Sequence, residues 1–218
     1  MNQHHPDEAL LLEYTAGTLS EPRALCVRLH LAQCSRCRSQ VDLLNSLGAV
    51  LLDNRMARMP VPTPAPAAND ALFARILGEI DQPAPRPEKP HPRGDLLQRV
   101  LGAPLDELPW KRQLGAVSVY DLSERLGSHQ ERVVLQRLDA GGKAPVHTHR
   151  GDELTLVLAG GFMDETGVFE EGDLVLRDTQ HVHTPEALHG EDCVTLSVLS
   201  APVRLTGRFM RLLNPFIR

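Results

Sequence analysis

Residues 141–161 read GGKAPVHTHRGDELTLVLAGG and decide the fold class of the second half of the chain. The run ELTLVL within it is rich in residues that favour β-strands, and Gly and Asp bound it on both sides. Three further runs have the same character, namely VVLQRLDAGG, GDLVL and CVTLSVL, and they are separated by Gly, Asp and Pro turns. We therefore predict a β-sandwich or β-barrel for this half.

The same stretch carries side chains that bind metals. His147 and His149 lie two residues apart and so share one face of a strand, and Glu153 follows four residues later. His183 falls on what should be a facing strand, with His181 as its alternative because the two lie on the same side. Three imidazoles and a carboxylate suit zinc, iron, manganese or nickel, so we predict a divalent metal site here.

A second group of such ligands lies near the N-terminus, where residues 30–37 read HLAQCSRC. On a helix, His30, Cys34 and Cys37 would fall within roughly 60° of arc. One imidazole and two thiolates suit tetrahedral zinc, which requires a fourth ligand. His5 is the first candidate and His4 the next, while Cys26 lies two turns away from Cys34. The spacing predicts a structural zinc site.

Two proline-rich stretches divide the chain, PVPTPAPAA at 60–68 and PAPRPEKPHP at 83–92. Neither can continue a helix or pair within a central strand, so both are expected to be extended tethers. Residues 1–59 before them read as three helices, with Gly17 ending the first and Ser20 capping the second. A unit of some 60 residues is small for a self-sufficient core, which favours a stabilising metal.

Between the tethers, the segment NDALFARILGEIDQ at 69–82 predicts an amphipathic helix. Its apolar face is expected to bind a partner protein, as a helix does in a groove. The alternative is that it docks on the chain's own first three helices. The residues of this face are Leu72, Phe73, Ile76, Leu77 and Ile80.

Composition narrows the function classes. The chain has 218 residues and a net charge of −5, without a basic tract, which disfavours direct binding of nucleic acid. No apolar run is long enough to span a membrane, and MNQHHPDEALLLEY lacks the features of a secretion signal. We expect a cytoplasmic protein, in which cysteine pairs more often bind metal than form disulfides.

Both halves carry a family resemblance. The spacing of Gly141, His147, His149, Glu153 and Gly160 matches the first cupin motif without a gap. The second cupin motif is kept in the spacing of its glycine and histidine, but three other positions depart from its usual Pro, Gly and Asn. The glycine and histidine are Gly172 and His183, and the departures are Asp178, Gln180 and Ala187. An upstream His followed by H-x3-C-x2-C resembles the zinc-binding anti-sigma module. In this order, the two halves resemble the ChrR family of anti-sigma factors over nearly the whole chain.

The resemblance implies a two-domain α plus β protein, with a small zinc-binding helical bundle followed by a cupin jelly roll. We expect the helical anti-sigma domain at 1–82, a linker at 83–95 and the cupin at 96–218. The zinc ligands would be His5, His30, Cys34 and Cys37, and the cupin would hold a second divalent metal, with zinc as first candidate. The cupin ligands would be His147, His149, Glu153 and His183.

The implied function is that of a regulator and not an enzyme. The helical domain would sequester a sigma factor of the extracytoplasmic-function type, and the cupin would serve its release under oxidative stress such as singlet oxygen or organic peroxides. The resemblance leaves dimerisation of the cupin open. The alternative is a metal-dependent cupin dioxygenase or isomerase with an appended helical module, because an open position in the metal set would permit such chemistry.

Overall fold

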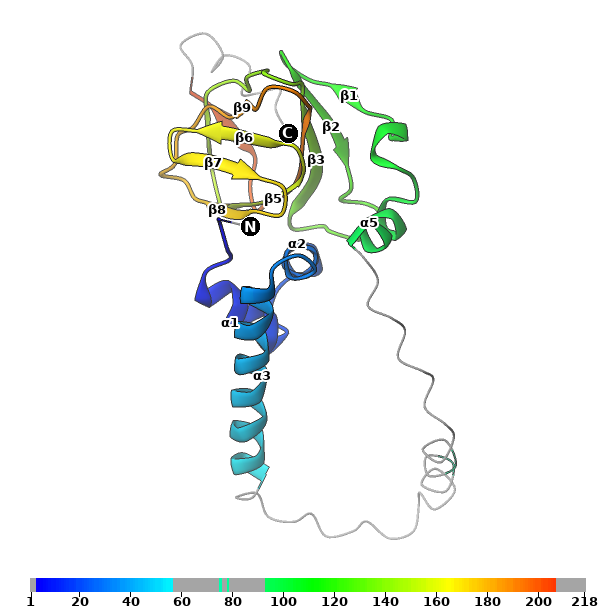
Figure 1. Ribbon diagram of the computed structural model, residues 1–218, viewed down its shortest axis with the longest axis vertical. Helices are drawn as coiled ribbons and strands as arrows, with labels where there is room; N and C mark the ends of the chain where they lie inside the picture. Colours follow the sequence, from blue (N-terminus) through cyan, green and yellow to red (C-terminus); the bar gives the residue numbers. More distant parts are fainter. Residues whose placement is uncertain (1–2, 57–74, 76–77, 79–92, 207–218) are drawn as a thin grey trace.

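The structure is a computed structural model that describes residues 3–56, 75, 78 and 93–206 (Figure 1). Most of the 69–82 segment lies outside the described residues, as do the five residues of its predicted partner-binding face. These are Leu72, Phe73, Ile76, Leu77 and Ile80. No helix among the residues described is long and apolar enough to cross a membrane.

Three helices form the N-terminal unit: α1 (Glu8–Ala16), α2 (Glu21–Leu31) and α3 (Ser35–Met56). The Asp7 carboxylate accepts a hydrogen bond from Leu10 N at 2.8 Å and so caps α1. Gly17 ends that helix in the left-handed conformation, with φ of 69°. Pro22 lies in the first turn of α2, where its missing N–H leaves no helical hydrogen bond unmade. The predicted end of α1 is therefore confirmed. Ser20 lies at the N-cap position of α2 as predicted, but its hydroxyl donates to Glu131 of the barrel unit and not to the helix.

The second unit is an antiparallel β structure, as predicted. Its largest sheet has the order β1-β2-β3-β10-β5-β8. These strands are β1 (Lys111–Arg112), β2 (Val117–Asp121), β3 (Arg132–Leu138), β10 (Cys193–Leu199), β5 (Glu153–Ala159) and β8 (Leu174–Arg177). Opposite it lie two smaller sheets, β7-β6-β9 and β11-β4 (Figure 1). Their strands are β7 (Gly167–Glu170), β6 (Gly161–Asp164), β9 (Glu186–Ala187), β11 (Val203–Leu205) and β4 (His147–His149). The arrangement is that of a cupin barrel.

Helix α5 (Arg93–Leu101) and the short 3-10 helix η1 (Leu105–Glu107) precede the barrel. The first of these begins within the segment 83–95 that the sequence suggested as a linker. Helix α5 contacts α2, so the chain returns to the N-terminal helices before it enters the sheet.

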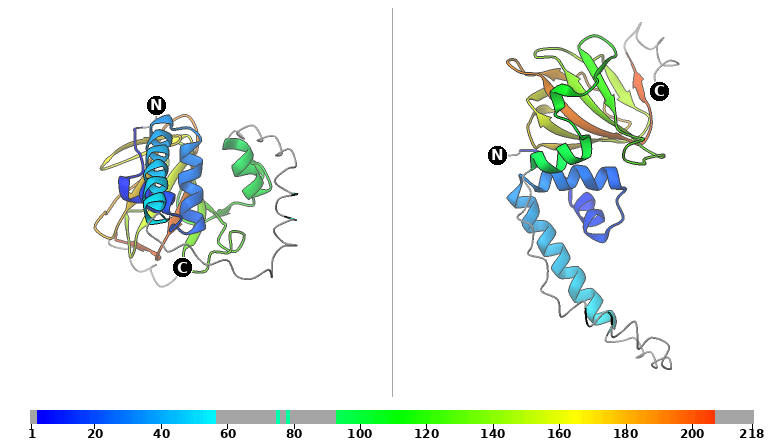
Figure 2. Two further views of the ribbon diagram at one scale, coloured as in Figure 1. Left: turned by 90° about the horizontal axis from the view of Figure 1, so that it is seen from below. Right: turned by 90° about the vertical axis from the view of Figure 1, so that its right-hand side faces the viewer.

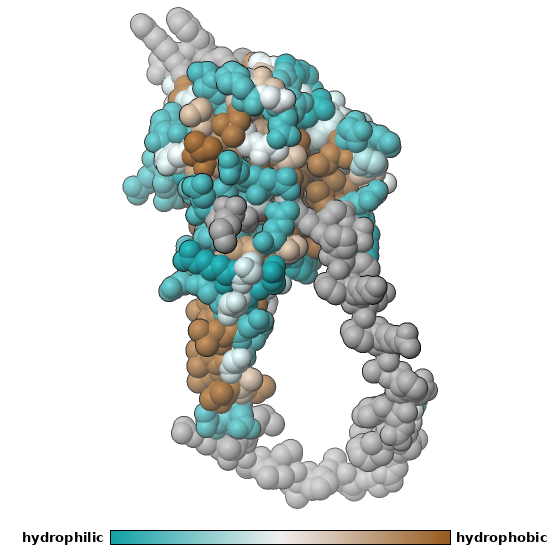
Figure 3. Space-filling view, in the orientation of Figure 1, coloured by the Kyte–Doolittle hydropathy of each residue, from teal (hydrophilic) through white to brown (hydrophobic). Residues whose placement is uncertain are grey.

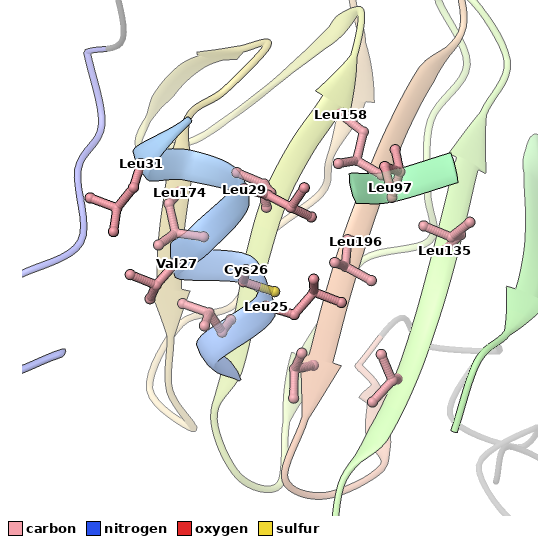
Figure 4. Packing of buried hydrophobic residues seen from close by; sticks show 14 of the residues in the cluster. Leu25, Cys26, Val27, Leu29, Leu31, Leu97, Leu135, Leu158, Leu174 and Leu196 are labelled. Carbon is pink, nitrogen blue, oxygen red and sulfur yellow. The ribbon is translucent and has the colours of Figure 1, made fainter. Parts of the chain in front are cut away.

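Helix α2 lies directly on the large sheet, in contact with β5, β8 and β10 (Figure 4). Val27 of α2 and Leu196 of β10 are both fully buried and belong to one continuous hydrophobic cluster. At the edge of this contact, Arg23 of α2 pairs with Glu131 and Asp152, each at 2.5 Å. The helical unit and the barrel therefore share a core, although the sequence suggested two units joined only by a tether.

Helix α3 extends away from both the barrel and the other helices (Figure 1, Figure 2). Its first turns pack against the shared core through Val41 and Leu44. Beyond them, Leu47 and Leu51 continue the same apolar spacing of three and four residues, but they are 52% and 61% exposed. The outer half of α3 is thus an apolar helix surface that the described part of the chain does not cover.

Candidate metal centres

The first ligand group converges from three places in the helical unit. His5 precedes α1, His30 lies in the last turn of α2, and Cys34 and Cys37 flank the start of α3. His5 Nδ1 is 3.4 Å from both sulfurs, and His30 Nε2 is 3.3 Å from Cys37 Sγ. Tetrahedral zinc bonds of about 2.3 Å to sulfur and about 2.0 Å to nitrogen place these atoms about 3.5 Å apart. The donor atoms therefore fit a zinc ion.

The structure separates His5 from the other candidates for the fourth position. The ring of His4 turns to the barrel and packs on Phe169 with ring centroids 4.3 Å apart. Cys26 lies in the shared core, where burial raises the pKa of its thiol to about 12. The group whose donor atoms lie within 4.8 Å of one another contains neither of them.

The barrel contributes to this group through the backbone. His30 Nδ1 lies 2.8 Å from Gly172 O, at the turn between β7 and β8. A carbonyl oxygen only accepts, so Nδ1 carries the proton and Nε2 presents its lone pair to the cluster. Burial and the neighbouring Cys34 raise the pKa of Cys37 to about 12, so the free thiol is protonated and a bound cation would have to displace that proton.

The second group forms inside the barrel from His147, His149, Glu153 and His183, with donor atoms within 4.8 Å of one another. His149 Nε2 lies 3.1 Å from both Glu153 Oε2 and His183 Nε2. Backbone hydrogen bonds of 3.1 and 3.0 Å join His147 to His183 and bring the facing segments into register. His181, the alternative to His183, instead bonds to the exposed Asp178 at 2.7 Å.

The protonation of this second group also suits a cation. His147 Nδ1 donates to Pro145 O at 2.7 Å and His183 Nδ1 to Asp164 Oδ2 at 3.1 Å, so both Nε2 atoms are left as acceptors. Burial and the neighbouring His183 lower the pKa of His147 to about 4, which keeps its ring neutral. Among the residues described, buried His149 Nδ1 has no hydrogen-bond partner. The donor set fits a divalent metal held by nitrogen and oxygen.

A cavity of about 480 Å³ opens beside this group. Val117, Val119 and Val134 line it from β2 and β3, and His147 and Glu153 line it from the ligand group. Its size and mostly apolar walls are typical of a site for a small molecule. The barrel can therefore admit an apolar compound to the cluster.

Sequence reasoning missed the exposed apolar surface of α3. Leu43, Leu47, Val50 and Leu51, which we call the α3 stripe, are between 52% and 70% exposed. Their spacing of four, three and one places them on one side of the helix. The available signal was length, because a helix of 22 residues is too long for a unit of this size to cover.

The fold and the two ligand groups define the chain as a zinc-finger-type helical unit joined to a cupin barrel. Two family models match it in this order: a putative zinc-finger over residues 8–38 and the ChrR cupin-like domain over residues 98–202. The chain is 35% identical to the anti-sigma-E factor ChrR of Cereibacter sphaeroides over 225 residues, which span 99% of this chain and 98% of that protein.

A solved structure agrees. The crystal structure of Rhodobacter sphaeroides SigE in complex with the anti-sigma ChrR matches with a TM-score of 0.74 and 33% identity, over 91% of this chain and 100% of that chain. The chain belongs to the ChrR family of anti-sigma factors, whose members are regulators and not enzymes. Family membership therefore favours the regulator over the alternative of a cupin dioxygenase or isomerase.

Proposed function

We propose that this chain sequesters a sigma factor of the extracytoplasmic-function type in the cytoplasm and releases it under oxidative stress, such as singlet oxygen or organic peroxides. Family membership supports the first part of the proposal, because the relative of known structure forms a complex with SigE. The observation in this chain that carries it is the α3 stripe.

The α3 stripe has the properties of a partner surface. Leu43 is 70% exposed and Val50 57%, at positions where a helix of a monomeric protein normally presents polar residues. The hydropathy view shows this apolar surface along α3, below the mainly hydrophilic barrel (Figure 3). Burying one large apolar side chain contributes about 1.5–3 kcal/mol, so four of them can supply much of the affinity for an amphipathic groove.

The face at 69–82 is proposed as a second part of the same partner surface. Its residues Leu72, Phe73, Ile76, Leu77 and Ile80 follow α3 along the chain and have the same apolar character. Two apolar helical faces connected by a tether could close on opposite sides of a partner.

Each metal centre has a different proposed role. Zinc held by His5, His30, Cys34 and Cys37 would fix the start of α3 relative to α1 and α2, and so orient the α3 stripe. The second divalent metal, held by His147, His149, Glu153 and His183, belongs to the barrel that is proposed to sense the signal. Zinc is the first candidate for it.

Accessibility supports the barrel as the sensing unit. Cys34 and Cys37 are only 6% and 0% exposed, so an oxidant in solution meets neither sulfur directly in the folded chain. The barrel cavity, by contrast, leads from the surface to His147 and Glu153. A signal that enters there must then reach the helical unit across the contacts between the two units.

The test is co-expression of the tagged chain with the sigma factor encoded nearest to its gene, followed by purification and metal analysis. We expect an equimolar complex that retains zinc and that dissociates when the purified complex is exposed to singlet oxygen or an organic peroxide. Purification of a zinc-loaded chain without the sigma factor would contradict sequestration. A complex that survives both oxidants would contradict the proposed signal alone.

A further inference from the structure

The N-terminal arm that carries His5 is bound to the barrel through the two residues before it, Gln3 and His4. Gln3 N and His4 N both donate to Asp173 Oδ1, at 2.9 and 3.2 Å. Leu174 N, at the start of β8, donates to His4 O at 3.2 Å. Asp173 is 1% exposed, so these bonds anchor the arm to a buried carboxylate. The position of His5 therefore depends on the barrel as well as on the helices.

The side chain of His4 fixes the arm further. Its ring packs on Phe169, and its Nε2 lies 3.1 Å from Val168 O in β7. The carbonyl only accepts, so His4 Nε2 donates and the ring orientation is determined on two sides. His5, the next residue, presents Nδ1 to both sulfurs.

A second connection comes from the same turn. The carbonyl of Gly172 accepts from His30 Nδ1, as described above. Gly172 has φ of 92°, a conformation that side chains with a Cβ rarely adopt, so glycine allows its carbonyl this direction. The turn between β7 and β8 thus holds two of the four residues of the zinc group, His5 through the arm and His30 directly.

The turn is also connected to the second ligand group. The guanidinium of Arg177 lies 5.2 Å from the Phe169 ring centroid, on the same ring that His4 contacts. Arg177 Nη2 bonds to Asp164 Oδ2 at 2.7 Å, and that same oxygen accepts from His183 Nδ1. The side chain of Asp164 is 0% exposed and that of Arg177 is 8% exposed. A buried ion pair does not rearrange without its partners, because an unpaired charge there is costly.

We propose that His4 is a positioning residue for the zinc group, and that the series His183, Asp164, Arg177, Phe169 and His4 couples the two ligand groups. Metal at His183 would hold its ring against Asp164, and the buried pair would hold Phe169 and the arm in turn. Loss of that metal would loosen the series and weaken metal binding at His5. By thermodynamic linkage the effect is reciprocal, so the zinc group also influences the affinity of the barrel. The inference rests on the two metal sites of the proposed function.

The test is a cobalt(II) titration of the full chain, in which thiolate-to-cobalt absorption reports only the group that contains Cys34 and Cys37. The barrel group is weakened by His147→Ala, a half-buried position beside the cavity. We expect this change to raise the cobalt dissociation constant of the thiolate group about fivefold or more, the lower end of typical couplings. In a His4→Ala background, His147→Ala should raise this dissociation constant less than about twofold. His129→Ala, at an exposed histidine, is the matched control for His4→Ala. In the His129→Ala background, His147→Ala should still raise the cobalt dissociation constant of the thiolate group about fivefold or more.

Phe169→Leu gives an independent version of the test, because it retains a buried apolar side chain and removes the ring that joins His4 to Arg177. It should also reduce the coupling below about twofold. An equal effect of His147→Ala in all backgrounds, or no effect in any, would overturn the proposal. A cobalt dissociation constant of the thiolate group in His4→Ala equal to that of the wild type would show that His4 does not position the group, and would overturn the proposal as well. Sigma-factor binding is measured on the same samples, so a failure of coupling with an intact complex is distinguishable from a failure of the proposed function.

Discussion

At the scale of single residues, three histidines of the two groups are oriented for metal by an oxygen that accepts a hydrogen bond from the ring nitrogen facing away from the group. His30 donates to Gly172 O, His147 to Pro145 O and His183 to Asp164. Each bond fixes which ring nitrogen presents a lone pair, so little rearrangement is required when a cation enters. Only the bond of His183 ends on a charged group.

Asp164→Asn tests that charged bond. The amide is nearly the same size but carries no charge, and we expect it to weaken metal binding by the barrel group about 10- to 100-fold. Although burial alone would raise the pKa of Asp164, its bonds to His183 and Thr166 and the charge of Arg177 lower that pKa well below its usual range. Asp178→Asn, at an exposed carboxylate beside His181, is the control. Competition with a chelator measures both affinities, and equal values would contradict the role of Asp164.

The sulfurs of the zinc group provide a second prediction at this scale. Replacing Cys34 and Cys37 together by serine should lower the zinc content by one equivalent and abolish binding of the sigma factor. Cys26→Ala removes a buried thiol outside the group and should leave the zinc content unchanged. Elemental analysis of the purified proteins decides, and unchanged zinc in the double variant would refute the assignment.

The sequence named four candidate ligands for each group, and the structure brings the donor atoms of each set within 4.8 Å of one another. Spacing could not choose between His4 and His5, because both precede α1 by a few residues. The choice depends on Phe169 and Asp173, which lie more than 160 residues away in the chain. Contacts of that range leave no local signal in either segment.

At the scale of elements, α3 has one side that is packed and one side that is exposed. Val41 and Leu44 pack on the shared core, whereas the α3 stripe is exposed. An apolar spacing of three and four predicts a helix and its apolar side, but not what covers that side. For this reason the sequence indicated the helix, while the structure was required to locate its uncovered part. Likewise, the prolines at 83–92 predicted a tether but could not show that α5 begins at Arg93.

Leu47→Ser tests the α3 stripe as a partner surface. Loss of one buried leucine at an interface costs about 1.5–3 kcal/mol, which corresponds to a roughly 10- to 100-fold weaker complex. Thermal stability and zinc content should remain near those of the wild type, because Leu47 is 52% exposed in the free chain.

The matched control is Leu52→Ser, the same change on the same helix. Leu52 is 61% exposed but lies about 180° around the helix from Leu43, away from the α3 stripe. Calorimetric titration with the sigma factor compares the two variants. Equal losses of affinity would show that the effect is not specific to the stripe.

At the scale of the whole molecule, the shared core joins the barrel to the helices. Helix α2 contacts three strands of the large sheet, and its Val27 is fully buried. The prolines between the units had suggested that they are independent, but tethers of any composition permit docking when both sides present apolar surfaces. The boundaries at 82/83 and 95/96 stay predictions, and the described parts of the two units pack on one core.

Val27→Ala tests whether the two units unfold together. Trp110 is the only tryptophan of the chain and lies just before β1, so its fluorescence reports the barrel side. A cavity at Val27 should cost roughly 1–3 kcal/mol and lower the midpoint reported by Trp110 by several degrees, at about 2–4 °C per kcal/mol. Val50→Ala, the same change at an exposed position of α3, should leave the midpoint unchanged. An unshifted Trp110 transition in Val27→Ala would mean that the units unfold independently.

The central claim is that the intact chain withholds a sigma factor from RNA polymerase through its helical unit. A purified transcription assay tests it most directly, with core polymerase, the sigma factor encoded nearest to the chain's gene, and a promoter that this factor recognises. Increasing amounts of the zinc-loaded chain should reduce transcript in proportion and abolish it near one equivalent per sigma factor, with Leu52→Ser equal to the wild type and Leu47→Ser needing a clear excess. Full transcription in the presence of excess zinc-loaded wild-type chain would contradict the account.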